Sequence, residues 1–330
     1  MTTAAEPLPA HQELPAHEEL PEVKADNYAK LLARLSGLSV THHFDAYGDV
    51  AWDSPDFTID PADPRWELGD DEPLGATEWY RALPARKRAE LGLARVASMM
   101  KIGLEFERVL KQGLLEFAGT LPNGAPEFRY AYHEIIEEAQ HSLMFQEFVN
   151  RSGFDAVGLR PLERFGTRFI IGLGRRFPPL FFVFVLGGEE PIDYVQRKEL
   201  RSDVELHPLL ERVMRIHVTE EARHLSFARH YLRTKAKDLG PVDRLWLGAG
   251  TPIILSVMAQ MMLKPSAQLV QEYGIPRSVI REAYTRNPAH RAESLASMRR
   301  VRKLCQDMGL LTAGYQRVWR ALRLLEDPAA

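Results

Sequence analysis

The sequence predicts an all-α protein. Apolar residues recur at i, i+3 and i+4 over long stretches, which is the pattern of amphipathic helices. No sustained alternation of β-branched residues marks a strand. With 330 residues, 45% of them hydrophobic and 26% charged, the chain is long enough to bury a sizeable core. We therefore expect a helical bundle whose core helices are flanked by further helices.

The N-terminal quarter is predicted to contain little regular structure. Residues 1–25 are rich in Pro, Glu and Ala and cannot bury a core, so we expect a disordered tail followed by one helical domain over residues 26–330. Residues 26–36 have helical periodicity. Residues 40–75 are dense in Asp and Pro, and we expect an ordered wrap that is anchored by Trp52 and Trp66.

Long periodic stretches then follow one another. Helices are predicted at 78–117 and 127–150, with the second ending at Gly153. Residues 165–200 hold two helical stretches separated at 175–179, and residues 209–232 form the next helix. The remaining helices are predicted at 252–272, 277–285, 289–307 and 313–326.

Charge and cysteine content exclude several classes of protein. The formal net charge of −3 gives no reason to expect a nucleic-acid partner. The single cysteine, Cys305, cannot form an internal disulfide, which suits a reducing cytoplasm. The first 20 residues lack the apolar run of a signal peptide, and the most apolar segment, 177–188, is too short to span a membrane. We expect a cytoplasmic protein without a membrane partner.

Potential metal ligands occur in two related motifs. His217, Glu221 and His224 stand at i, i+4 and i+7, so they share one helix face. Glu138 and His141 repeat the Glu-x-x-His part on an earlier helix. Two such units on facing helices are typical of a dinuclear metal site, in which each ion takes a further Glu from another helix. For Glu138 and His141 alone a surface pair is equally compatible, and His217 could also be a core histidine.

The two further glutamates are chosen from their neighbours. Glu107 has apolar residues one and two turns away on its stripe, whereas Glu105, the alternative, has polar ones. In the second half we choose Glu190 over Glu189, partly because the spacings then agree: 138 − 107 = 31 and 221 − 190 = 31. The residues adjacent to proposed ligands are interpreted as surface charges or as partners of ligands: Glu137, Glu189 and Glu220.

Residues near Glu190 carry three further expectations. Pro191 predicts a kink or π-bulge, or else the start of a helix. Asp193 is expected to orient a ligand histidine, as the ligands of such sites require. Tyr194, one turn after Glu190, is expected to line the cavity. The aromatic cluster of Phe177, Phe181, Phe182 and Phe184 is interpreted as core that could also shape an apolar pocket.

The ligand types indicate the metal. Carboxylates and imidazoles without thiolates suit iron, with manganese as the alternative in one or both positions, and argue against a structural zinc site. Paired irons of this kind activate O2. No dinucleotide or flavin fingerprint is evident in the sequence, so the electrons are expected from an external donor.

The complete pattern resembles the ferritin-like di-iron carboxylate proteins. The segment His217-x-x-x-Glu221-x-x-His224 is more particular and resembles the di-iron arylamine N-oxygenases, the p-aminobenzoate N-oxygenase family, over about residues 98–231. The resemblance implies a ferritin-like bundle with two irons between four core helices, and O2-dependent oxidation of an aryl amine nitrogen towards nitroso or nitro products. It also implies seven metal ligands: Glu107, Glu138, His141, Glu190, His217, Glu221 and His224.

Two alternative functions stay open at this point. The same centre could serve a hydroxylase or desaturase that acts on an aliphatic small molecule, because a fold does not determine a function. A non-catalytic metal-binding or storage protein is the other alternative, although a minimal four-helix bundle needs far fewer residues than this chain has. A homodimer is expected.

Overall fold

The computed structural model describes residues 25–326, and all regular elements in that range are helices. The all-α prediction is therefore confirmed. The predicted tail lies outside the described residues, apart from Ala25, which begins α1 (Ala25–Thr41). The helix predicted at 26–36 is thus present and extends five residues further than expected.

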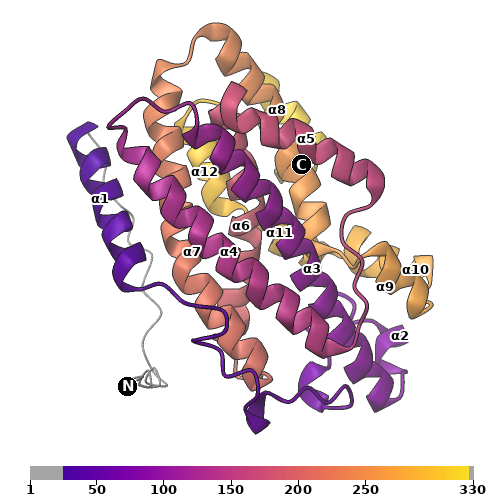
Figure 1. Cartoon of the computed structure of the whole chain (residues 1–330). Helices are drawn as coiled ribbons and strands as arrows, with labels where there is room; N and C mark the ends of the chain where they lie inside the picture. Colours follow the sequence, from indigo (N-terminus) through magenta and orange to yellow (C-terminus); the bar gives the residue numbers. More distant parts are fainter. Residues whose placement is uncertain (1–24, 327–330) are drawn as a thin grey trace, which may run out of the picture.

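Four long helices form the centre of the molecule. They are α3 (Ala85–Ala118), α4 (Pro126–Ser152), α6 (Pro178–Glu199) and α7 (Pro208–Lys235). The chain makes two helix pairs, α3 with α4 and α6 with α7, and the two pairs face each other (Figure 1). This is the arrangement of a ferritin-like bundle.

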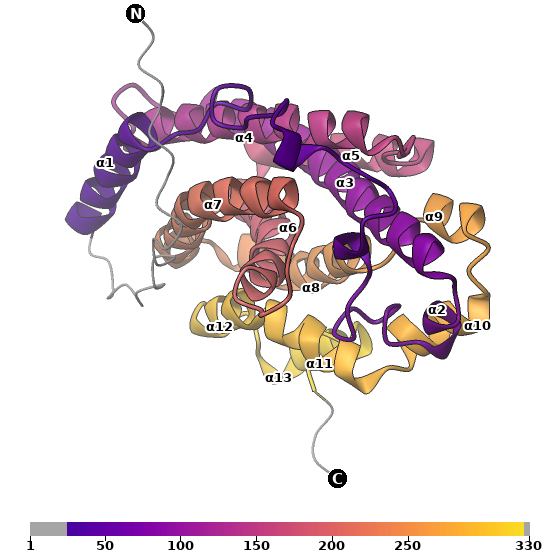
Figure 2. The same cartoon turned by 90° about the horizontal axis from the view of Figure 1, so that it is seen from below.

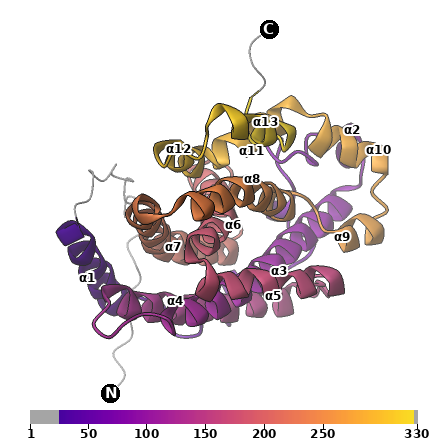
Figure 3. The same ribbon diagram turned by 90° about the horizontal axis from the view of Figure 1, so that it is seen from above.

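The flanking helices extend the bundle into layers. Figures 2 and 3 show α4, α3 and α5 (Pro161–Arg176) on one side, then α7, α6 and α8 (Pro241–Leu263), and finally the C-terminal helices. Because α6 lies in the middle layer, it is covered on nearly all sides. The shorter helices are α2 (Glu78–Arg81), α9 (Ala267–Glu272), α10 (Arg277–Ile280), α11 (Pro288–Ser297), α12 (Arg299–Asp307) and α13 (Ala313–Ala321).

Local signals determine where the core helices begin and end. Proline stands in the first turn of α4, α6 and α7, where its missing amide hydrogen costs nothing and its φ is already helical. The His207 side chain accepts a hydrogen bond from the amide of Leu209 at 3.3 Å and so caps α7. Gly153 has a φ of 71°, a left-handed conformation that ends α4.

Several predicted bounds differ from the structure. The helix predicted at 78–117 is broken before α3, at Pro84. Helix α8 begins eleven residues before the predicted Pro252, and Pro252 lies inside it. Pro191 is likewise inside α6, so no helix starts there. Both prolines follow a glycine by four positions, Gly248 and Gly187, which reduces crowding against the i−4 carbonyl.

Residues 42–77 wrap around the core helices, where η1 (Pro55–Phe57) packs on α7 and η2 (Pro64–Trp66) packs on α3. Trp52 and Trp66 are buried, which confirms their predicted role as anchors. The Trp66 ring stacks on the His207 ring with centroids 4.4 Å apart. The amide of Phe44 donates to Glu220 Oε1 at 3.0 Å, so the wrap also reaches the centre of the bundle.

Two apolar segments differ in how deeply they are buried. Of the aromatic cluster predicted as core, Phe181, Phe182 and Phe184 are buried in α6, and Phe177 is partly buried against the same core. Among the described residues one stretch, Pro241–Glu272, is long and apolar enough to cross a membrane, and 44% of its apolar window is buried in the protein. Helix α8, which forms most of this stretch, packs on α6 and α13.

Candidate metal centre

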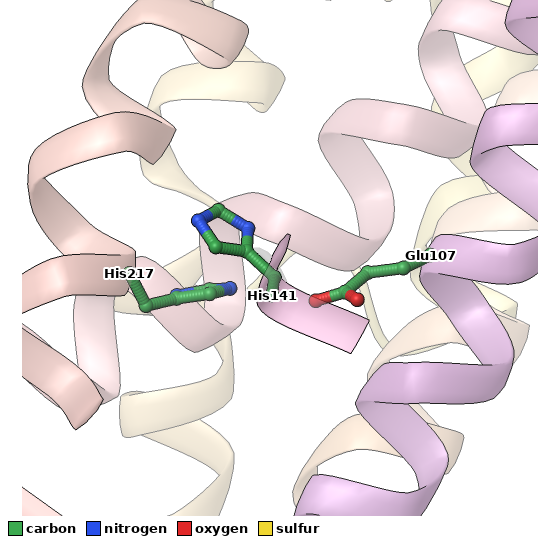
Figure 4. Close-up of side chains that lie close together, drawn as sticks. All are labelled: Glu107, His141 and His217. Carbon is green, nitrogen blue, oxygen red and sulfur yellow. The ribbon is translucent and has the colours of Figure 1, made fainter. Parts of the chain in front are cut away.

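Four carboxylates and three imidazoles project into the space between α3, α4, α6 and α7. Their ligating atoms form overlapping trios in which all atoms lie within 4.8 Å of one another. The trios are Glu107, His141 and His217; Glu138, Glu221 and His224; and Glu189, His217 and Glu221. Figure 4 shows the first trio, with side chains from α3, α4 and α7 directed toward one another. The structure therefore brings together six of the seven predicted ligands.

The donor atoms in this space fit metal ions. Glu107 Oε1, both oxygens of Glu138, Glu221 Oε2 and His141 Nδ1 are buried without a hydrogen-bond partner. Buried polar atoms are nearly always hydrogen-bonded. Five buried oxygen and nitrogen atoms without a hydrogen bond therefore indicate that they bind metal ions instead. Four carboxylates packed together also repel one another, and cations offset that repulsion. Since the described donors include no thiolate, the set suits iron or manganese.

The two Glu-x-x-His histidines are held by reciprocal contacts across the bundle. Nε2 of His141 on α4 donates to Glu220 Oε2 on α7 at 2.8 Å. Nε2 of His224 on α7 donates to Glu137 Oε2 on α4 at 2.7 Å. Each contact leaves Nδ1 directed at the centre and fixes the ring orientation. His224 and Arg223 outweigh the effect of burial on Glu137 and lower the pKa of its carboxyl to about 2.

His217 is oriented from a third helix. Its Nδ1 lies 2.8 Å from Gln196 Oε1 of α6, so Nε2 faces the centre, 3.8 Å from Glu221 Oε1. Its ring centroid is 4.8 Å from that of His141. Burial, and then the nearby His141, lower the pKa of His217 to about 3. The imidazole is therefore neutral and can donate a lone pair to a metal.

Glu107 is supported by its own polar contacts. Ser142 Oγ donates to Glu107 Oε2 at 2.7 Å, while Lys111 Nζ donates to Ser142 and to the carbonyl of Glu138. These contacts leave Oε1 free for a metal. Burial, and then the neighbouring Glu138, raise the pKa of Glu107 to about 8. The alternative residue, Glu105, instead forms ion pairs with Arg108 and Arg164.

The structure places Glu190 outside the group and Glu189 inside it. Glu190 Oε1 accepts from Arg229 Nε at 2.7 Å, and Oε2 accepts from the amide of Val301 at 2.8 Å. We therefore correct the proposed ligand set by replacing Glu190 with Glu189. The interpretation of Glu189 as a surface charge is also wrong, because it is only 3% exposed. Apolar neighbours could not show which face of α6 points to the metal centre, because α6 is buried on every side around residues 189 and 190.

Asp193 and Tyr194, the two residues expected to support the site, differ in what they contact. Asp193 pairs with Arg197 at 2.7 Å, and Arg197 donates to the carbonyl of Val218 beside His217. Asp193 thus supports the backbone of α7 through Arg197, and its charge also acts on His217. Tyr194 faces Glu293 of α11 and does not line the cavity.

Two buried polar residues of the centre, Glu134 and Gln196, were not assigned to it from the sequence, and both are less than 5% exposed. Glu137 and Glu220 were interpreted as surface charges or as partners of ligands; both are buried, and each contacts a ligand histidine. The doubled glutamates Glu137-Glu138 and Glu220-Glu221 were a usable signal, because the first member of each pair can reach the opposite helix. Nothing in the sequence around Gln196 distinguished it from an ordinary surface glutamine.

A cavity of about 30 Å³ adjoins one side of the centre. Glu107, Glu189, His217 and Gln196 form its polar wall. The rest of the lining is made of Met99, Met100, Gly103, Phe106, Phe145, Gly188, Ile192 and Met262. Gly188 keeps this region compact, because a Cβ there would lie 2.1 Å from the Phe106 ring. The cavity therefore meets the metal ligands with a largely apolar surface.

The fold and the site together define a helical-bundle protein with a carboxylate- and histidine-lined dinuclear metal centre. Residues 25–309 match the family described as p-aminobenzoate N-oxygenase AurF, and the chain belongs to this family of ferritin-like di-iron oxygenases. Uncharacterised proteins from Mycobacterium tuberculosis and Mycobacterium bovis are 39% identical over 302 residues, covering 92% of this chain and 89% of each relative. No solved structure matches the chain.

Proposed function

We propose that this protein is an O2-dependent di-iron oxygenase that oxidises the nitrogen of an aryl amine towards nitroso or nitro products. The observation that carries the proposal is the position of His217. It stands in a trio with Glu107 and His141 and also forms part of the cavity wall. His217 is the additional imidazole of the segment His217-x-x-x-Glu221-x-x-His224, on which the resemblance to the N-oxygenases rests. It lies on the side of the metal centre that adjoins the cavity.

Neighbouring side chains orient the ligands on the cavity side of the metal centre and keep water away from it. Glu220 and Gln196 orient His141 and His217 through their other ring nitrogens. Phe106, Phe145 and the methionines exclude water, which strengthens electrostatic interactions at the centre. Two irons held here would supply the reduction of O2, with electrons from an external donor. Manganese is the alternative in either position.

The size of the cavity determines what substrate entry requires. About 30 Å³ admits little more than one water molecule. An aryl amine therefore enters only when side chains move, and Met99, Met100 and Met262 are the flexible members of the wall. The described lining contains no arginine or lysine, so the part of the substrate that reaches the centre is uncharged.

A second candidate function follows from the same lining. An apolar wall of Met, Phe and Ile side chains also suits an aliphatic chain, as a hydroxylase or desaturase requires. The external electron donor, the homodimer and the cytoplasmic location stay predictions. A non-catalytic storage role does not account for an apolar cavity that meets the ligands.

Single-turnover oxidation separates these candidates. The iron-loaded protein is reduced without oxygen and then exposed to ¹⁸O2 together with an aryl amine or a fatty acid. We expect ¹⁸O on the amine nitrogen, detected by mass spectrometry, and none with the variant Glu138→Ala. Labelled hydroxyl on the fatty acid alone would instead establish the second candidate. Two bound irons without any oxidised product would contradict both.

A further inference from the structure

Glu134 on α4 is a buried carboxyl group that the proposed ligand set does not use. It is 0% exposed, and neither of its oxygens has a hydrogen-bond partner among the described residues. Burying a carboxyl group without a partner is costly, whether it is charged or neutral. A protonated Glu134 would still leave its hydroxyl and carbonyl groups unsatisfied. Glu134 therefore needs a partner from outside the described residues, such as a metal ion.

The surroundings of Glu134 point to the metal centre. Its strongest charge interaction is with His224, followed by those with Glu138 and Glu221. These three residues form one of the trios of ligating atoms. The hydroxyl of Tyr130, one turn earlier on α4, is also buried without a partner and also interacts most strongly with His224. Two orphaned groups on α4 thus share His224 as their first charged neighbour.

The internal repeat of the bundle gives an independent reason to look at this position. Glu134 precedes Glu138 by four residues on α4, and His217 precedes Glu221 by four residues on α7. His217 faces His141 of the opposite helix, and the first charged neighbour of Glu134 is His224 of the opposite helix. In the register of its helix, Glu134 therefore stands relative to Glu138 as His217 stands relative to Glu221.

We propose that Glu134 is a carboxylate ligand of the metal ion that Glu138, Glu221 and His224 hold. The inference rests on the proposed dimetal centre. It makes the two ions chemically different, because one receives an additional imidazole and the other an additional carboxylate. Glu134 does not line the cavity, whereas His217 does. The ion bound by Glu134 is then the one further from the substrate.

Cobalt titration of the metal-free protein tests this assignment without relying on activity. The variant Glu134→Gln keeps the size of the side chain and removes its charge. Glu105→Gln is the matched control, because Glu105 is a buried glutamate on α3 that pairs with arginines outside the centre. Bound cobalt is counted by elemental analysis and followed by its visible spectrum. Circular dichroism of the metal-free variants verifies folding.

We expect two cobalt ions in the wild-type protein and in Glu105→Gln. Glu134→Gln should bind the first ion normally and the second at least about tenfold more weakly, with an altered spectrum. Unchanged binding of both ions would overturn the role of Glu134 alone. A wild-type protein that binds fewer than two ions would overturn the dimetal centre as well. If Glu134→Gln does not fold, a cobalt-loaded wild-type crystal decides: a Glu134 oxygen about 2.2 Å from the ion supports the proposal, and one beyond hydrogen-bond distance overturns it.

Discussion

His141 on α4 and Glu220 on α7 are 2.8 Å apart, from Nε2 to Oε2, and both side chains are 0% exposed. Glu220 also accepts the amide of Phe44 at 3.0 Å and faces Arg223 at 3.4 Å. The carboxylate is therefore fixed by groups from the wrap and from its own helix. A histidine held in this way keeps one tautomer, with Nδ1 available to a metal.

Replacing Glu220 should loosen His141 without removing a ligand. We expect Glu220→Ala to weaken the binding of at least one ion by about 10–100-fold, measured by metal titration. Glu211→Ala is the control, because Glu211 lies on the exposed side of α7, where it pairs with Arg215. Equal metal affinity in the two variants would show that the contact with Glu220 does not support His141.

Glu189 and Glu190 provide a matched pair of adjacent glutamates. Glu189→Ala should lose metal while remaining folded, because it removes a ligand from the third trio. Glu190→Ala should keep both metals and lose about 3–5 kcal/mol of unfolding free energy, since it leaves Arg229 without its buried partner. Elemental analysis and chemical denaturation measure the two effects. The reverse pattern would restore Glu190 as the ligand.

Metal binding should strengthen as the pH rises toward 8. In the metal-free protein the raised pKa of Glu107, about 8, keeps its carboxyl protonated at neutral pH. A metal ion must displace that proton, so affinity grows by up to about tenfold per pH unit for each proton released and levels off above the pKa. Titrations between pH 6 and 9 measure the slope. Glu107→Gln should reduce it by one proton, and an unchanged slope would contradict this.

Met99 should control access to the cavity. It is a half-buried member of the lining, and its removal widens the space beside His217. We expect Met99→Ala to raise the turnover of bulkier aryl amines relative to aniline, and Met99→Trp to lower it, at equal iron content. Met298→Ala, a core substitution outside the lining, should not change the ratio of rates. Identical substrate preference in all three variants would place the entry route elsewhere.

The sequence predicted the fold class and most of the site because both depend on helical periodicity. His217, Glu221 and His224 share a face of one helix, and that face was correctly directed inward. The choice between Glu189 and Glu190 failed because α6 is buried on all sides at that level, so hydrophobic neighbours carry no direction. The equal spacing of 31 positions favoured the wrong residue. Contacts between helices, such as that of Gln196 with His217, have no signal within one helix.

Two helix boundaries differ from those predicted by periodicity: the helix predicted at 78–117 is broken at Pro84, and α8 begins before residue 252. Pro84 separates α2 from α3, whereas Pro252 lies inside the continuous helix α8. In α8 the packing against α6 and α13 holds the helix together through Pro252. Tertiary contacts thus override a local preference that the sequence states clearly.

The iron content of the reconstituted wild-type protein tests the central claim most directly. Metal-free protein is titrated with ferrous iron without oxygen, excess metal is removed, and iron per chain is measured together with the Mössbauer spectrum. The proposed centre predicts two irons per chain in unequal environments. One iron, or none, at saturation would contradict a dinuclear site between α3, α4, α6 and α7.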